Sequence, residues 1–385
     1  MQQKVEEIAL MRGLAIMGIV LLHVTAYFLV AERADFLSFK LALVLNQSVR
    51  FCLPLFLIIS GFGLAYNYRK TGDIKLSRFF KKRFNRVFIP YVIWSVVYFG
   101  FYLTVLGKIP NDAKFMDFNS FSANWAEIGL IFAKNLLFGR NYVHLYFVIL
   151  IVQFYLLYPF LIKRLSKFRD HTVILLMAFF AYLLLMVYFF HFRKLTGIYL
   201  IDWFVKYYWK TFVAWYFYFL LGLSMGLRLE TFQRFAEKYF VASAIFYLVT
   251  LALVVAEAFL YPPYDIGRLT SLRVSVLLNT LAAVPFFFKL LNMLKDKLCL
   301  PVGILEQMGN NSFGIYFIHL LVIYFFSTIM CYYAPGLFSF YRTSFIISLF
   351  LVSILFSLLA VKLFNRLPFG HLFTGVQINR SKACE

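Results

Sequence analysis

The sequence predicts an all-α polytopic membrane protein with about ten transmembrane helices and both termini in the cytoplasm. Of its 385 residues 63% are hydrophobic, and the mean hydropathy is +0.80, whereas soluble domains contain about 45–50% apolar residues. Apolar stretches recur along the whole chain without a polar block large enough for a soluble domain, so residues 1–385 are predicted to form a single transmembrane domain. The stretches approach the ~20 residues of a membrane-crossing helix, whereas barrel strands are alternating segments of about ten residues.

Ten apolar segments qualify as spans: 10–30, 45–66, 87–106, 142–162, 172–192, 211–227, 239–260, 271–292, 311–333 and 343–363. Two weaker stretches lie between them. Residues 121–139 are interrupted by Glu127 and Lys134, which predicts an interfacial or re-entrant helix. Residues 201–210 contain the aromatic side chains typical of a membrane interface.

The distribution of basic residues predicts the orientation. Basic residues concentrate at the chain ends and in the loops that follow the even-numbered spans, and residues 68–86 contain eight lysines and arginines in nineteen positions. By the positive-inside rule these loops and both termini lie in the cytoplasm. This topology, together with attraction to the anionic lipids of the bilayer, accounts for the net charge of +21 better than nucleic-acid binding does.

The first span contains two ionisable residues, Arg12 and His23. Eleven steps of about 100° leave them about 20° apart around the helix and about 16 Å apart along it. Arg12 alone is explained as a positive-inside anchor, and His23 alone as an interhelical hydrogen-bonding residue. Because ionisable residues inside a bilayer usually serve a function, their shared face favours a functional pair.

Several motifs in order resemble those of the acyltransferase-3 family, membrane enzymes that O-acylate bacterial surface polysaccharides. The spacing of Arg12 and His23 resembles the signature of that family's first span, and Arg83 and Arg86 resemble its Arg-x-x-Arg pair. Three longer stretches are also similar, namely RFCLPLFLIISGF (50–62), HLYFVILIVQFYLLYP (144–159, with Tyr146 where tryptophan is usual) and NNSFGIYFIH (310–319). No extracellular SGNH-hydrolase domain follows the tenth span, which suggests the stand-alone type.

The resemblance implies an enzyme of the bacterial cytoplasmic membrane that takes an acyl group from cytoplasmic acyl-CoA, most simply acetyl-CoA. The acceptor would be a hydroxyl of a surface polysaccharide or lipid-linked glycan. His23 is the candidate general base or, alternatively, an acylated relay, and Arg12, on the same helix face, is the second catalytic candidate. Arg83 and Arg86 lie on one helix face and are suited to the phosphates of CoA, although they also belong to the positive-inside cluster.

Four further residues are weaker candidates. His144 is expected to orient the acceptor or pair with His23, or else to be an interface histidine. Ser60 is expected either to serve helix packing or to take part in the reaction. His319 is expected in the inner half of the ninth span, either as a core hydrogen-bonding residue or in a CoA tunnel, and Glu127 could polarise a histidine. The histidines lack metal-ligand spacing, so neither a metal nor a permanently bound cofactor is predicted.

A transporter or flippase for polysaccharide or lipid-linked saccharide is the competing function. Ten helices with basic loops suit both classes, but a flippase needs polar or charged groups on several spans. Here the strongest polar residues converge on one line from the cytoplasm outward, formed by Arg83, Arg86, Arg12 and His23. This arrangement favours a narrow tunnel for an acyl thioester.

Overall fold

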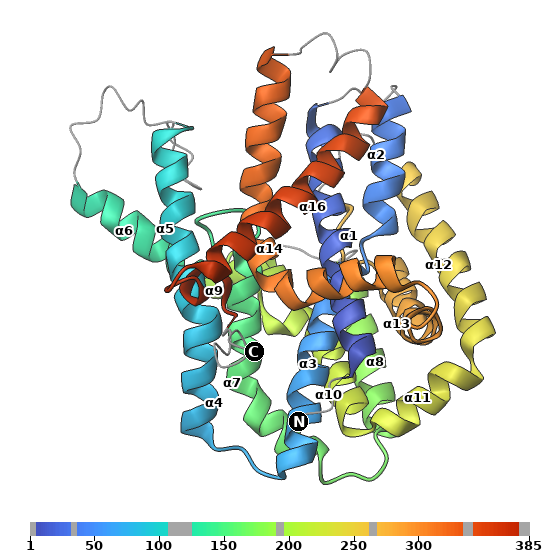
Figure 1. Cartoon of the computed structure of the whole chain (residues 1–385). Coiled ribbons are helices and arrows are strands. Elements are labelled where there is room, and N and C mark those ends of the chain that lie inside the picture. Colours follow the sequence, from blue (N-terminus) through green and yellow to red (C-terminus); the bar gives the residue numbers. More distant parts are fainter. Residues whose placement is uncertain are drawn as a thin grey trace, which may run out of the picture.

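The computed structural model describes residues 5–31, 37–106, 125–189, 196–261, 268–333 and 342–376, and within these ranges it contains helices and no strand (Figure 1). The longer helices are α1 (Glu6–Ala31), α2 (Leu37–Ser48), α3 (Cys52–Thr71), α4 (Leu76–Arg83), α5 (Ile89–Thr104), α6 (Trp125–Phe138), α7 (Tyr146–Leu165), α8 (Thr172–Val187), α9 (Tyr199–Tyr207), α10 (Tyr216–Leu227), α11 (Leu229–Lys238), α12 (Phe240–Leu260), α13 (Val274–Leu294), α14 (Cys299–Tyr333) and α16 (Arg342–Arg366). The shorter elements are the π-helix Phe84–Phe88, the 3₁₀ turns Tyr208–Lys210 and Phe212–Ala214, and α17 (His371–Thr374).

The prediction of an α-helical polytopic membrane protein is confirmed. Eight helical stretches in the described ranges are long and apolar enough to cross a membrane. The two remaining predicted spans correspond to shorter apolar helices, α8 with 16 residues and α10 with 12. Many large apolar side chains on α8, α12 and α16 are exposed, as expected for surfaces that face lipid.

The second predicted span, 45–66, is not one continuous helix. The chain turns at residues 49–51, between α2 and α3. The end of α2 carries Asn46 and Gln47, whose side chains are buried and hydrogen-bonded. A helix can break at membrane depth where its freed polar groups are buried in protein or face a cavity.

Helix α1 lies inside the bundle and packs against α2, α3, α14 and α16. Small residues allow the closest approaches between helices: a β-carbon on Gly309 would overlap the backbone of Ala9, and one on Gly222 would overlap that of Ile58. Such contacts let helix backbones pack tightly inside a bilayer. They fix α1 against α14 and α3 against α10, and these helices carry most of the site described below.

One end of the bundle carries a basic helix. Figure 1 shows α4 and α11 at one end and α2 at the other. Helix α4 has the sequence LSRFFKKR and includes four cations, so this end is the one that the positive-inside rule assigns to the cytoplasm. Helix α6 lies within the weak segment predicted at 121–139, of which residues 121–124 fall outside the described ranges.

Candidate active site

One cavity lies toward the basic end of the bundle and has a volume of about 380 Å³. It brings together Arg12 from α1, Ser60 from α3, Arg83 from the end of α4 and Arg86 from the π-helix. A π-helical turn inside an α-helix often marks a functional site. The structure thus places three of the predicted cations in one cavity, which we call the inner cavity.

Aromatic rings hold one of these cations in place. The Arg83 guanidinium carbon lies 5.0 Å from the ring centre of Tyr155 and 5.4 Å from that of Phe79, a cation–π arrangement. Within the described residues, neither Arg12 nor Arg83 has a carboxylate partner, and no carboxylate lines the inner cavity. Its lining is therefore cationic and suited to phosphate.

A second basic hollow adjoins the inner cavity. It has a volume of about 430 Å³ and shares Arg83 with the inner cavity. Lys75, Arg78 and Lys82 also line it, together with Asp73. The cationic surface therefore extends past Arg83 along α4, further than the Arg-x-x-Arg pair alone indicates.

The C-terminal segment forms one wall of the inner cavity, through Thr374, Gly375 and Val376. The indole nitrogen of Trp94 donates a 2.9 Å hydrogen bond to the Phe373 carbonyl and fixes this segment against α5. Gly375 has a φ of 67°, and a β-carbon there would overlap the carbonyl oxygen of Arg86. Sequence reasoning missed this wall, although Gly375 at the end of a short helix was an available signal.

A separate, larger cavity lies farther along α1, away from the basic end, and has a volume of about 830 Å³. It is lined by His23 of α1, by His144 just before α7, and by Arg50 at the break between α2 and α3. Aromatic side chains form much of the remaining lining: Tyr146, Phe147, Phe189, Tyr208, Trp209, Trp215 and Tyr316. We call it the outer cavity.

Three histidines cluster at the outer cavity. The ring centre of His319 lies 5.2 Å from that of His23 and 5.5 Å from that of His144. His319 is the ninth residue of the predicted span 311–333, and its ring lies beside that of His23. Helix α14, which carries it, begins at Cys299, twelve residues before that span.

Hydrogen bonding leaves several ring nitrogens of the cluster available. His319 is fully buried, and its Nδ1 lies 3.1 Å from the Ile315 carbonyl, to which it donates. The Nε2 of His319 and both ring nitrogens of His144 have no hydrogen-bond partner in the described residues. No hydrogen bond to His23 is present within the same part of the chain. The described residues include no group of three His, Cys, Asp or Glu side chains that could hold a metal ion.

Phe147 and Tyr316 line both cavities and mark where they meet. The Tyr316 hydroxyl donates a hydrogen bond to the His144 carbonyl. Arg12 borders the inner cavity and His23 the outer one. Arg12 and His23 thus line two neighbouring cavities, one on each side of Phe147 and Tyr316.

Not every predicted residue lines one of these two cavities. Glu127 is exposed on α6 and lines neither cavity. Ser60 lines the inner cavity, whereas its neighbour Gly61 packs against α10, where a β-carbon would overlap the Phe219 carbonyl. The two small residues therefore divide into one cavity residue and one packing residue.

The chain is similar to a known membrane-protein family and to proteins of two bacteria. Residues 5–362 match the family model described as "Acyltransferase domain". A Staphylococcus aureus protein (strain N315) named "Probable poly-beta-1,6-N-acetyl-D-glucosamine export protein" is 25% identical over 257 residues, which cover 66% of this chain and 65% of that protein. A Bacillus subtilis (strain 168) protein named "Putative membrane-bound acyltransferase YfiQ" is 23% identical over 330 residues, 82% of this chain and 80% of that one. No solved structure gives a significant match.

Proposed function

The chain belongs to the acyltransferase-3 family, whose model covers residues 5–362, and on that premise we propose that it is a membrane O-acyltransferase. It transfers an acyl group, most simply acetyl, from cytoplasmic acyl-CoA to a hydroxyl of a surface polysaccharide or lipid-linked glycan. The observation that carries this proposal is the meeting of a cationic cavity and a histidine-lined cavity at Phe147 and Tyr316. The bacterial relatives support the cytoplasmic membrane of a bacterium as its location.

The inner cavity binds the donor. CoA carries phosphate groups that require fixed cations, and guanidinium groups contact phosphate through two parallel hydrogen bonds. Arg83 and Arg86 supply these contacts, and the neighbouring basic hollow along α4 supplies more positive charge. Arg12 lies in the same cavity, where it steers the thioester arm toward the boundary with the outer cavity.

Acyl transfer takes place at the outer cavity by one of two chemical routes. In the first, a His23 ring nitrogen takes the proton of the acceptor hydroxyl while its oxygen attacks the thioester carbon. The tetrahedral intermediate collapses, the C–S bond breaks, and CoA leaves as a thiolate that receives the proton from the imidazolium.

In the second route, the His23 nitrogen itself attacks the thioester carbon and CoA leaves as a thiolate. The acceptor oxygen then attacks the acyl-imidazole, the C–N bond breaks, and the proton passes from the hydroxyl to the imidazole. In both routes His319 lies against His23 and orients its ring. His144 adjoins His319 and faces the incoming acceptor.

Saccharide export is the second candidate function, and the name of the Staphylococcus aureus relative favours it. The large aromatic outer cavity would suit a sugar in either case. An exporter, however, needs no histidine cluster at the meeting point of two cavities. Loss of His23 should therefore abolish the activity of an acyltransferase but leave saccharide export intact.

A strain lacking the gene, restored with chosen variants, separates the two functions. We expect the wild-type gene to restore alkali-labile O-acyl groups on the surface polysaccharide and His23→Ala to restore none, with unchanged polysaccharide amount. His171→Gln is the matched control, because His171 bonds Ser224 and Leu165 and lines neither cavity. Loss of surface polysaccharide with normal O-acyl content per sugar would instead establish export.

A further inference from the structure

The break between α2 and α3 carries a cation that the proposed chemistry does not use. Arg50 lies in the turn at residues 49–51, and its side chain lines the outer cavity. Interrupted helices in membrane proteins often provide ligand sites near the middle of the bilayer. Arg50 is therefore placed where it can contact a ligand of the outer cavity.

Arg50 has little to balance its charge. Its Nη2 donates a 2.5 Å hydrogen bond to the side-chain oxygen of Asn46. Its Nε is buried without a hydrogen-bond partner, and no carboxylate pairs with it in the described part of the chain. A guanidinium inside the membrane is expensive unless it is paired, and it usually marks a substrate or ion site.

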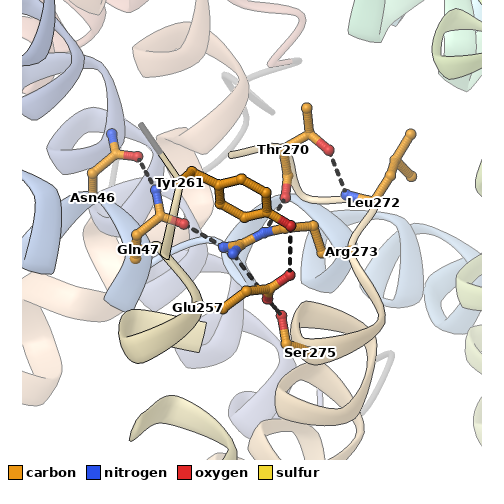
Figure 2. Close-up of polar contacts among 8 residues, drawn as sticks. All are labelled: Asn46, Gln47, Glu257, Tyr261, Thr270, Leu272, Arg273 and Ser275. Carbon is orange, nitrogen blue, oxygen red and sulfur yellow. Dashed lines mark hydrogen bonds and ion pairs between the residues drawn. The ribbon is translucent and has the colours of Figure 1, made fainter. Parts of the chain in front are cut away.

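A neighbouring arginine shows what a paired cation looks like in the same region. Arg273 forms a 2.9 Å ion pair with Glu257, donates to the Gln47 side chain, and reaches the Thr270 carbonyl at 3.3 Å (Figure 2). Glu257 also accepts hydrogen bonds from Ser275 and Tyr261. Its carboxylate is therefore already engaged by other groups.

The same network holds Arg50 in position. Gln47 donates a 3.0 Å hydrogen bond to the Asn46 side-chain oxygen, which also accepts the bond from Arg50. The Asn46 amide donates in turn to the Leu22 carbonyl at 2.9 Å and to the Thr25 hydroxyl at 3.0 Å. Arg50 is thus tied to the turn of α1 that carries His23.

The rest of the outer cavity has a distinctive chemistry. Tyr146, Tyr208, Trp209 and Trp215 line it, and aromatic rings of this kind can cover the apolar face of a sugar. Its lining also contains a second arginine, Arg268, and no carboxylate. A cavity lined by cations raises the local concentration of anions.

We propose that Arg50 binds an anionic group of the saccharide acceptor, a carboxylate or a phosphate, next to the hydroxyl that is acylated. The planar guanidinium can donate two parallel hydrogen bonds to either group. The acceptor is accordingly an acidic glycan or a glycan that still carries a phosphate. This inference rests on the proposed function for the identity of the acceptor, but the binding itself can be measured without acyl transfer.

The test is binding of three probes to the purified full chain, measured by titration calorimetry. The probes are octyl β-D-glucuronide, an octyl glucosyl phosphate diester and the neutral octyl β-D-glucoside. We expect at least one anionic probe to bind about tenfold more tightly than the neutral one, which corresponds to ~1.4 kcal/mol. A glucuronide preference assigns a carboxylate, and a phosphodiester preference assigns a phosphate.

Variants connect the preference to Arg50. Arg50→Gln should bring the three affinities to within about twofold of one another, whereas the control Lys40→Gln, an exposed cation on α2, should keep the wild-type preference. If Arg50→Gln does not fold, Arg50→Lys decides, because it keeps the charge and loses the planar fork. We expect Arg50→Lys to lose at least about two thirds of the preference for the anionic probe over the neutral one.

Three results would overturn the inference. One is equal binding of all three probes by the wild type, and another is a full preference in both Arg50 variants. The third is that the protein prefers succinyl-CoA over acetyl-CoA in a manner that depends on Arg50, while it binds the three probes equally. That result would mean that Arg50 binds an anion on the acyl group and not on the acceptor. Arg50-dependent anion binding without any acyl transfer would refute the proposed function and leave the site standing.

Discussion

The inner and outer cavities share helix α1 and the pair Phe147 and Tyr316, yet their polar groups differ. The inner cavity gathers arginines from α1, α4 and the π-helix and has no histidine in its lining. The outer cavity has histidines, indoles and an arginine at a helix break. On the proposed function, the inner cavity recognises the charged donor and the outer cavity carries the chemistry at the acceptor. Substitutions in the inner cavity should therefore weaken donor binding, whereas substitutions in the outer cavity should slow acyl transfer.

The largest effect is expected at the outer cavity. His23→Ala should lower acyl transfer at least about 100-fold, because general-base and nucleophilic histidines contribute this much or more. Acetyl-CoA affinity should stay within about twofold of the wild type, since the inner arginines are untouched. Single-turnover transfer and equilibrium binding on the same purified preparation measure both quantities. A parallel loss of binding would mean that the cavities are not separable.

Arg12→Lys should follow in size, with a loss of about tenfold or more in kcat/KM, or ~1.4 kcal/mol. Lysine preserves the positive charge at the start of α1 but lacks the planar fork. Topology, read from the side on which a C-terminal tag is cleaved, should not change. Full activity of the lysine variant would return Arg12 to the role of a membrane anchor.

Arg83→Ala and Arg86→Ala should each weaken acetyl-CoA binding about tenfold, with kcat at saturation little changed. Charged hydrogen bonds to phosphate justify this size. Lys81→Ala is the matched control, because Lys81 is exposed on the same helix and lines neither the inner cavity nor the adjoining hollow. Equal losses in all three variants would indicate a diffuse charge effect in place of a phosphate site.

Tyr316→Phe probes the boundary and should produce a smaller effect. It removes the hydrogen bond to the His144 carbonyl, a bond worth about 1 kcal/mol. Transfer should fall about three- to fivefold while acetyl-CoA affinity holds. A larger loss of acetyl-CoA binding than of transfer would mean that Tyr316 acts mainly in donor binding at the inner cavity.

Glu127→Gln should produce the smallest effect, with transfer within about twofold of the wild type. Glu127 is exposed on α6 and away from both cavity linings, so its charge is screened from the histidines. Initial transfer rates in matched membrane preparations check this. A tenfold loss would show that α6 approaches the outer cavity during turnover.

Hydropathy and helix spacing predicted the membrane class, the positions of most helices and the placement of Arg12 and His23 on one helix. They succeeded because the bilayer imposes a simple rule on length and polarity, and because Arg12 and His23 lie on a single helix whose period is known. The resemblance placed Arg83 and Arg86 together, and the structure sets them in one cavity with Arg12.

What the sequence did not predict depends on contacts between distant segments. The break at residues 49–51 lies inside a largely apolar run, although Asn46, Gln47 and Arg50 signalled it. The Glu257–Arg273 pair joins α12 to the start of α13, and the wall from Thr374 to Val376 closes a cavity formed by helices far from it in the sequence. No local pattern encodes such tertiary pairings.

The most direct test of the central claim is cysteine accessibility from the two sides of the membrane. The native Cys52, Cys299, Cys331 and Cys384 are replaced, and single cysteines are introduced as Ser60→Cys in the inner cavity or Val143→Cys in the outer one. A membrane-impermeant maleimide should label Ser60→Cys only from the cytoplasmic side, with protection by CoA, and Val143→Cys only from the opposite side. Labelling of both positions from the same side would contradict two cavities that open to opposite faces of the membrane.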